Sequence, residues 1–134
     1  MKVVLTFGVY DMLHIGHINL FKNAKELGDK LIVAVQRDDV IKKYKPTAEV
    51  RYTTDERVFM VESVKYVDEV ILYEDVDVDI KRIKFDIFAK GPDQIHSGFQ
   101  KAVEWCIDNG KEVVELPRTE GISSSLLRLG VKNK

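Results

Sequence analysis

The residues VVLTFGVYDMLHIGH, at positions 3–17, decide how this chain begins to fold. Residues 3–7 form a short apolar run rich in β-branched side chains, which predicts a buried β-strand. After Gly8 the pattern changes to apolar residues at helical spacing, namely Leu20, Phe21, Ala24 and Leu27. The stretch therefore predicts a strand, a loop that carries polar groups, and a helix.

The same alternation of strand and helix patterns continues along the chain. Four more short apolar runs follow, at residues 31–35, 69–72, 86–89 and 112–116. Between them apolar residues recur at helical spacing, as at Val58, Val61, Val64 and Val67. Gly28 and Gly110 lie where helices are expected to stop. Because alternating strands and helices are typical of parallel sheets, we expect an α/β fold, a Rossmann-like three-layer sandwich with a five-stranded parallel sheet, formed by residues 1–134 as a single domain.

The composition argues against several classes of protein. The 134 residues are 45% hydrophobic and 32% charged, which is typical of a globular protein. Because 21 Lys and Arg balance 22 Asp and Glu, we expect no binding of nucleic acid. We find no apolar stretch of membrane-spanning length, and residues 1–7 are too short an apolar run for a signal peptide. With a lone cysteine, Cys106, expected as a buried thiol on a helix, we predict a cytoplasmic protein.

The loop after the first strand has the composition of a phosphate-binding site. His14 and His17 stand three positions apart at the start of the predicted helix, so their imidazoles face the same way. Gly16 between them leaves room for a phosphate chain against the backbone. Unpaired N–H groups and the positive end of the helix dipole add to the attraction. Two such donors can stabilise charge that develops on a phosphoryl oxygen.

A zinc site is the alternative interpretation of these histidines. The remaining candidate ligands are His96 and Cys106, and Cys106 falls in an apolar helical pattern, so we do not expect zinc. A divalent cation held by a triphosphate and a carboxylate fits the residues better.

A second candidate anion site follows the last predicted strand. The string there contains Arg118, Gly121 and three serines, Ser123, Ser124 and Ser125. Arginine offers a planar fork of donors suited to phosphate, and the serines can cap a final helix. In parallel sheets, ligands bind beyond the carboxyl ends of the strands. Both anion sites are therefore expected at one edge of the sheet.

These strings give the chain its resemblance to a known family. The motif His-x-Gly-His at residues 14–17 resembles that of the nucleotidyltransferase superfamily, and Arg-Thr-Glu-Gly-Ile-Ser at residues 118–123 resembles the glycerol-3-phosphate cytidylyltransferase-like family within it. The likeness extends to residues 8–17, 27–29 and 66–71. It implies transfer of CMP from CTP, with Mg²⁺, to a phosphorylated small molecule, with glycerol 3-phosphate as first choice.

The resemblance also implies roles for individual residues. His14, His17 and Arg118 would act on the phosphates of CTP, and Asp11 would help to hold Mg²⁺. Lys43 and Lys45 would contact the acceptor phosphate, with a solvated basic turn as the alternative, and Arg57 would lie near the acceptor or at the exposed end of a helix. The expected binding residues are completed by Gly8, Val9, Tyr10, Gly16, Asp38, Lys90, Gly91, Asp93, Thr119, Ile122, Ser123 and Ser124. The resemblance also implies a homodimer.

Several features keep other substrates open. The string Gly-Pro-Asp-Gln at residues 91–94 stands where glycerol-phosphate enzymes usually have Gly-Asp-Asp-Trp, and it resembles that of archaeal FAD synthases. An adenylyltransferase of FAD synthase or heptose-phosphate type and an ethanolamine-phosphate cytidylyltransferase are therefore the alternatives. A non-catalytic nucleotide-binding module is a third, although no Gly-x-Gly-x-x-Gly follows the first strand. Class I tRNA synthetases share the string His-Ile-Gly-His, but the chain lacks the length for their additional domains.

Overall fold

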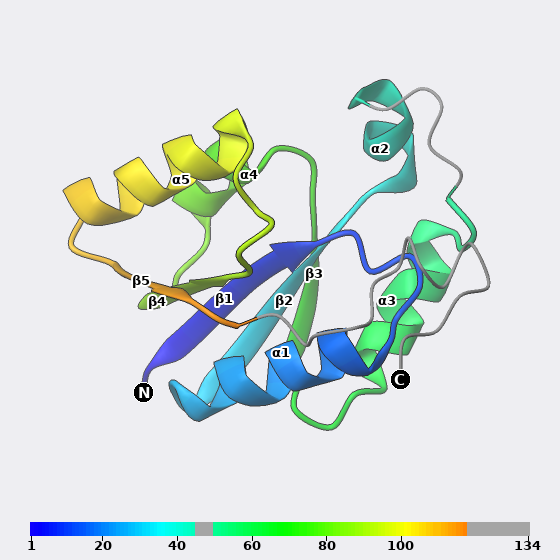
Figure 1. Cartoon of the computed structure of the whole chain (residues 1–134), viewed down its shortest axis with the longest axis horizontal. Helices are drawn as coiled ribbons and strands as arrows, with labels where there is room; N and C mark the ends of the chain where they lie inside the picture. The colour runs from blue at the N-terminus through cyan, green and yellow to red at the C-terminus, as the bar shows by residue number, and fades with distance from the viewer. Residues whose placement is uncertain (45–49, 118–134) are drawn as a thin grey trace.

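The computed structural model describes residues 1–44 and 50–117, and within them the chain forms one parallel sheet (Figure 1). Its five strands run in the order β3-β2-β1-β4-β5. Their bounds are β1 (Val3–Gly8), β2 (Lys30–Gln36), β3 (Glu69–Tyr73), β4 (Ile87–Lys90) and β5 (Glu112–Glu115). All neighbouring strands are parallel, so the predicted fold class is confirmed. The strand predicted at residues 86–89 begins one residue later, at Ile87, and the carboxylate of Asp86 just before it accepts a hydrogen bond from the N–H of Val3 at the start of β1 (2.8 Å).

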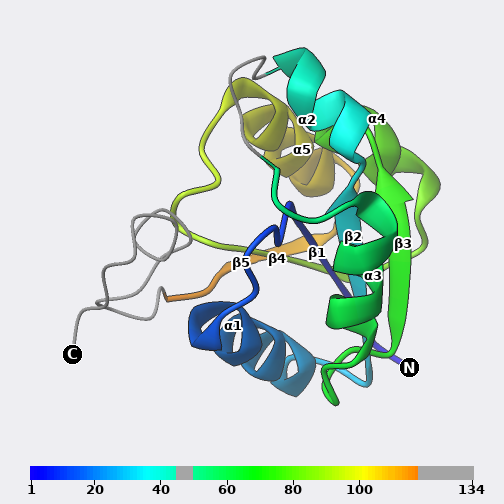
Figure 2. The same cartoon turned by 90° about the vertical axis from the view of Figure 1, so that its right-hand side faces the viewer.

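Helices cover both faces of this sheet, as Figures 1 and 2 show. The predicted helices are α1 (Ile15–Glu26), α3 (Thr54–Glu62) and α5 (Ser97–Asp108). The sequence did not predict α2 (Asp38–Tyr44), α4 (Val76–Asp79) or the 3-10 turn η1 (Ile80–Arg82), which are too short to establish a helical period. Helices α1 and α3 lie on one face, and α4 and α5 lie on the other.

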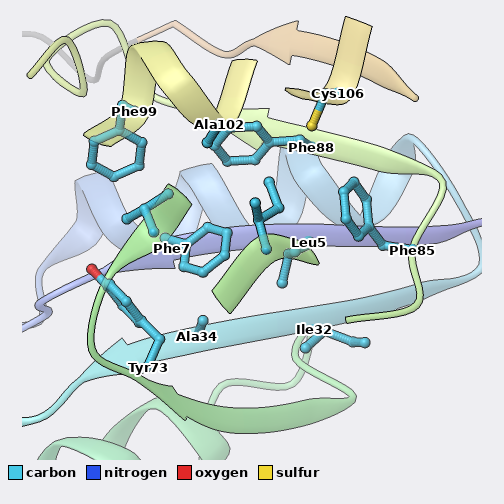
Figure 3. Close-up of a cluster of buried hydrophobic side chains, with 12 residues drawn as sticks. Leu5, Phe7, Ile32, Ala34, Tyr73, Phe85, Phe88, Phe99, Ala102 and Cys106 are labelled. Atoms are coloured by element: carbon cyan, nitrogen blue, oxygen red, sulfur yellow. The ribbon is translucent and has the colours of Figure 1, made fainter. Parts of the chain in front are cut away.

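The core consists of two layers, one on each face of the sheet. Alternation along β1 directs Val4 to the side of α1 and α3, where it joins Phe21 and Val61. Leu5 and Phe7 point to the other side, toward α5 (Figure 3). Burying one such aliphatic or aromatic side chain contributes roughly 1.5–3 kcal/mol. Because β1 is buried on both faces, the loop that follows it starts from a rigid strand.

The lone cysteine and the lone tryptophan are both part of this packing. Cys106 is buried on α5, as predicted, and burial raises the pKa of its thiol to about 11. The Trp105 ring lies 6.2 Å from that of Phe85, centroid to centroid. Neither side chain has the surroundings of a reactive group.

The helical spacing from Val58 to Val67 extends beyond the helix itself. α3 ends at Glu62, and Ser63 terminates it by donating its hydroxyl to the carbonyl of Phe59 (2.8 Å). Val64 and Val67 nevertheless pack against the core. Their spacing therefore reflects burial in a turn, and the predicted helical continuation was wrong.

The two glycines predicted to stop helices do so. Gly28 follows the last turn of α1, where a Cβ atom would lie 2.7 Å from the carbonyl oxygen of Lys2. Gly110 follows α5 with a φ of +71°, in the left-handed region that favours glycine.

The topology places the loops that follow β1, β2 and β4 at the carboxyl ends of the parallel strands. The chain moves outward from β1 through β2 to β3, then returns to β4 on the other side of β1. Such a reversal opens a crevice beyond the carboxyl ends of the two central strands. Among the described helices, none is long and apolar enough to cross a membrane.

Candidate active site

The first turn of α1 is capped by its own two histidines. Nδ1 of His14 accepts a hydrogen bond from the N–H of Gly16 (3.0 Å), and Nδ1 of His17 accepts one from the N–H of His14 (3.2 Å). The two rings stack with centroids 3.9 Å apart and an interplanar angle of 25°. The two imidazoles thus face the same way, as predicted, and backbone hydrogen bonds fix them there.

This reciprocal cap determines where each ring carries its proton. A ring nitrogen that accepts a hydrogen bond holds no proton, so in the neutral imidazole the proton lies on Nε2. Burial, with a smaller contribution from His14, lowers the pKa of His17 from 6.5 to about 3. His17 is consequently a neutral N–H donor at physiological pH. A neutral donor can bind a phosphoryl oxygen without losing its proton.

Gly8 and Tyr10 shape the loop that leads to this cap. Tyr10 has a φ of 54°, an uncommon value for a residue with a side chain, and it is buried. Its ring meets that of His17 edge-on, with centroids 5.3 Å apart. A Cβ atom on Gly8 would lie 2.5 Å from the Tyr10 ring, so only glycine leaves room for it. These two residues therefore orient His17.

Arg57 joins three segments that border the same edge. Its guanidinium donates to the carbonyls of Val9 (2.8 Å), Gln36 (2.7 Å) and Tyr52 (3.2 Å). The residue has no exposed surface, so the alternative that it forms the exposed end of a helix is wrong. Burial lowers the pKa of Arg57, and the carboxylates of Asp11 and Asp38 oppose that shift. The observed role of Arg57 is to hold the loops after β1 and β2 together.

Asp11, a buried carboxylate, holds the same loops by accepting hydrogen bonds from their backbone. It is 2% exposed, and its carboxylate accepts hydrogen bonds from the N–H groups of Arg51 (2.9 and 3.0 Å) and Tyr52 (3.0 Å). No cluster of three or more His, Cys, Asp or Glu side chains suited to a metal occurs in residues 1–44 and 50–117. Both carboxylate oxygens of Asp11 accept hydrogen bonds from backbone N–H groups, so in the free enzyme this carboxylate fixes the loop.

The remaining predicted residues fall into three groups. Asp38 begins α2, and its N–H donates to the hydroxyl of Thr54 (3.0 Å), while Lys43 is exposed further along that helix. Lys90, Gly91 and Asp93 lie at the end of β4 and in the turn after it. Lys45, Arg118, Thr119, Ile122, Ser123 and Ser124 fall outside the described residues. The structure thus links His14, His17, Gly8, Tyr10, Asp11, Asp38 and Arg57 around the end of β1.

The sequence did not predict the hydrogen-bonding roles of two polar residues near this edge, Gln94 and His96. Gln94 donates its side-chain N–H to the carbonyl of Phe7 in β1 (2.6 Å). His96 caps α5 as His14 caps α1, with Nδ1 accepting from the N–H of Gly98 (3.1 Å). The spacing His-x-Gly occurs at both helix starts, so this signal was present in the sequence.

Comparison with known proteins identifies the family. Residues 5–130 match the family described as Cytidylyltransferase-like. The chain is 39% identical over 132 residues to the glycerol-3-phosphate cytidylyltransferase of Bacillus subtilis (strain 168), covering 96% of this chain and 95% of that protein. It is 43% identical over 94 residues to the FAD synthase of Pyrococcus abyssi (strain GE5 / Orsay), covering 68% of this chain and 63% of that protein.

A solved structure supports the same assignment. The lipopolysaccharide core biosynthesis protein from Thermoplasma volcanium GSS1 superimposes with a TM-score of 0.71 at 29% identity, covering 89% of this chain and 97% of that one. Fold, site and sequence together define a nucleotidyltransferase. The chain belongs to the cytidylyltransferase-like family.

The three hydrogen bonds from Arg57 to backbone carbonyls give a prediction about stability. Replacing Arg57 with Met keeps much of the side-chain volume but leaves three carbonyls without their donor, so we expect the free energy of unfolding in urea to fall by about 3 kcal/mol. Arg82→Met is the matched control, because the Arg82 side chain also pairs with a carboxylate, that of Asp79, and donates to a carbonyl, that of Leu72, but is 57% exposed. For this variant we expect the free energy of unfolding to fall by less than about 1 kcal/mol. An equal loss of unfolding free energy in the two variants would show that Arg57 does not stabilise these loops.

The low pKa of His17 gives a prediction about pH. Between about 3 and 6.5 the unfolded chain binds a proton at His17 that the folded chain does not, so this residue makes stability rise with pH across that window. We expect the unfolding free energy of the wild type to fall more steeply than that of His17→Gln when urea titrations are repeated from pH 6.5 down to pH 4, within the window set by the two pKa values. Parallel curves would show that His17 titrates normally.

Proposed function

We propose that this enzyme transfers CMP from CTP to a phosphorylated small molecule, with glycerol 3-phosphate as the first acceptor to test. The observation that carries the proposal is the reciprocal histidine cap at the start of α1, after the carboxyl end of β1, because it leaves Nε2–H of each neutral ring as a donor. The similarity to a glycerol-3-phosphate cytidylyltransferase over 96% of the chain supports the choice of CTP.

The proposed reaction is a direct displacement at phosphorus. A phosphate oxygen of the acceptor attacks the α-phosphorus of CTP, the bond to the bridging oxygen of the β-phosphate breaks, and pyrophosphate leaves with that electron pair. Nε2–H groups of His14 and His17 donate to the oxygens on which charge develops. One such donor contributes about 3 kcal/mol to a transition state. Mg²⁺ would neutralise charge on the leaving phosphates when bound with the nucleotide, and in this proposal Asp11 would help to hold it.

The supporting residues act before the chemical step. Tyr10 and the backbone of the cap hold the His17 ring in place, so the donor orientation is set in the free enzyme. Arg57 and Asp11 hold the loops on the β2 side, where Lys43 is an exposed residue of α2. In the proposal Lys43 binds the acceptor phosphate from that side, as a flexible cation.

An adenylyl transfer to a flavin phosphate is the second candidate. It is supported by the 43% identity to an archaeal FAD synthase and by the turn Gly91-Pro92-Asp93-Gln94, which differs from the string of glycerol-phosphate enzymes. The two candidates share the histidine chemistry and differ in the base of the nucleotide and in the phosphorylated acceptor.

Pyrophosphate release tests the proposal. We expect release with CTP, Mg²⁺ and glycerol 3-phosphate, and we would repeat the assay with ATP and riboflavin 5′-phosphate. Release only with ATP selects the second candidate, and no release across a wider panel of phosphorylated acceptors contradicts both.

A variant of His14 separates capping from catalysis. Asparagine is a good N-cap but lacks a ring nitrogen in the place of Nε2, so we expect His14→Asn to retain its stability and lose about 100-fold or more in kcat. His96→Asn is the matched control, because it makes the same change at the cap of α5. A His14→Asn enzyme with the wild-type rate would remove His14 from the mechanism.

A further inference from the structure

The strongest unassigned feature is a single side chain at the point where the sheet order reverses. β1 pairs with β4 at Val4 and Leu5, whereas its pairing with β2 continues to Gly8. Beyond Leu5 the two central strands therefore part. The side chain of Gln94 lies at this place and donates to the carbonyl of Phe7 (2.6 Å), across 87 positions of sequence.

Gln94 also closes the turn in which it stands. Its side-chain oxygen accepts from the N–H of Gly91 (3.1 Å), and its backbone N–H donates to the carbonyl of Gly91 (3.2 Å). Lys90 holds the same turn by donating to the carbonyls of Gly91 (3.4 Å) and Gln94 (3.5 Å) and by pairing with Glu115 (3.1 Å). Residues 91–94 are thus a compact unit, and the amide of Gln94 fastens this unit to β1.

The carbonyl that Gln94 binds is next to the histidine loop. Phe7 directly precedes Gly8, over which the Tyr10 ring packs, and Tyr10 contacts His17. The hydrogen bond from Gln94 therefore sets where the turn 91–94 stands relative to the two imidazoles.

We infer that Gln94 is a positioning residue that places the turn 91–94 as a wall of the crevice for the nucleoside part of the triphosphate. The inference rests on the proposed function. In that proposal the phosphates lie at the start of α1 and the acceptor approaches from the β2 side, where Lys43 lies. β4 stands on the opposite side of β1, so its turn faces the nucleoside.

Binding measurements separate this role from general stability. We would measure the dissociation constants of CTP, ATP and inorganic tripolyphosphate, each with Mg²⁺, for the wild type and for Gln94→Met, which has similar length but makes no such hydrogen bonds. We expect the preferred nucleoside triphosphate to bind about tenfold more weakly to Gln94→Met, which corresponds to the loss of about one hydrogen bond. Tripolyphosphate should bind with unchanged affinity, because its site at α1 is intact.

The chain offers a matched control for this variant. Gln100 also donates its side-chain N–H to a backbone carbonyl, that of Ile95 (2.8 Å), but it lies exposed on α5. Gln100→Met should bind all three ligands like the wild type. Urea unfolding of both variants shows whether their folds are intact.

Several outcomes would overturn the inference. Equal weakening of tripolyphosphate and of the nucleoside triphosphate in Gln94→Met would show a general structural effect, and unchanged binding of both would show no role. A wild type that binds tripolyphosphate as tightly as CTP and ATP would show that no nucleoside wall exists. The measurement needs no turnover, so a failure of the proposed transfer reaction is recognised separately, by the pyrophosphate assay.

Discussion

The reciprocal hydrogen bonds between His14, Gly16 and His17 are the constraint on which the site depends. A serine cap would satisfy the N–H groups of the helix equally well, but serine has no counterpart of the second ring nitrogen, Nε2. Nδ1 of each imidazole accepts a hydrogen bond from a backbone N–H. The hydrogen bonds that cap the helix therefore also fix the proton of each neutral ring on Nε2. The site is therefore organised before any substrate arrives, which is the condition under which hydrogen-bond donors contribute most to a transition state.

Buried polar side chains extend this order to the surrounding loops. Burying a charge is unfavourable unless it is fully hydrogen-bonded. The guanidinium of Arg57 meets that condition with three carbonyls, and the carboxylate of Asp11 meets it with the N–H groups of Arg51 and Tyr52. On the other side of β1, the amide of Gln94 bonds the carbonyl of Phe7. The rigid central strand thus carries polar connections to the loops on both of its sides.

Local patterns in the sequence were enough to predict the sheet, the long helices and the family. Short apolar runs marked all five strands, and the string His14-Ile15-Gly16-His17 marked the start of α1. The burial of Arg57 was not predictable, because an arginine in the first turn of a helix is usually exposed and its partners Val9 and Gln36 are distant in sequence. The hydrogen bond of Gln94 was not predictable either, because its partner Phe7 is distant in sequence. The helix α4 was not predicted, because its four residues are too few to show a helical period.

The tautomers of the two histidines test the central claim most directly. Long-range ¹H–¹⁵N correlation spectra of protein labelled with ¹⁵N at histidine report which ring nitrogen carries the proton. The account predicts protonated Nε2 and unprotonated Nδ1 for both His14 and His17 at neutral pH, with the Nε2 signals shifting when CTP and Mg²⁺ are added. A proton on Nδ1 of either ring, or Nε2 signals that do not respond to the nucleotide, would contradict it.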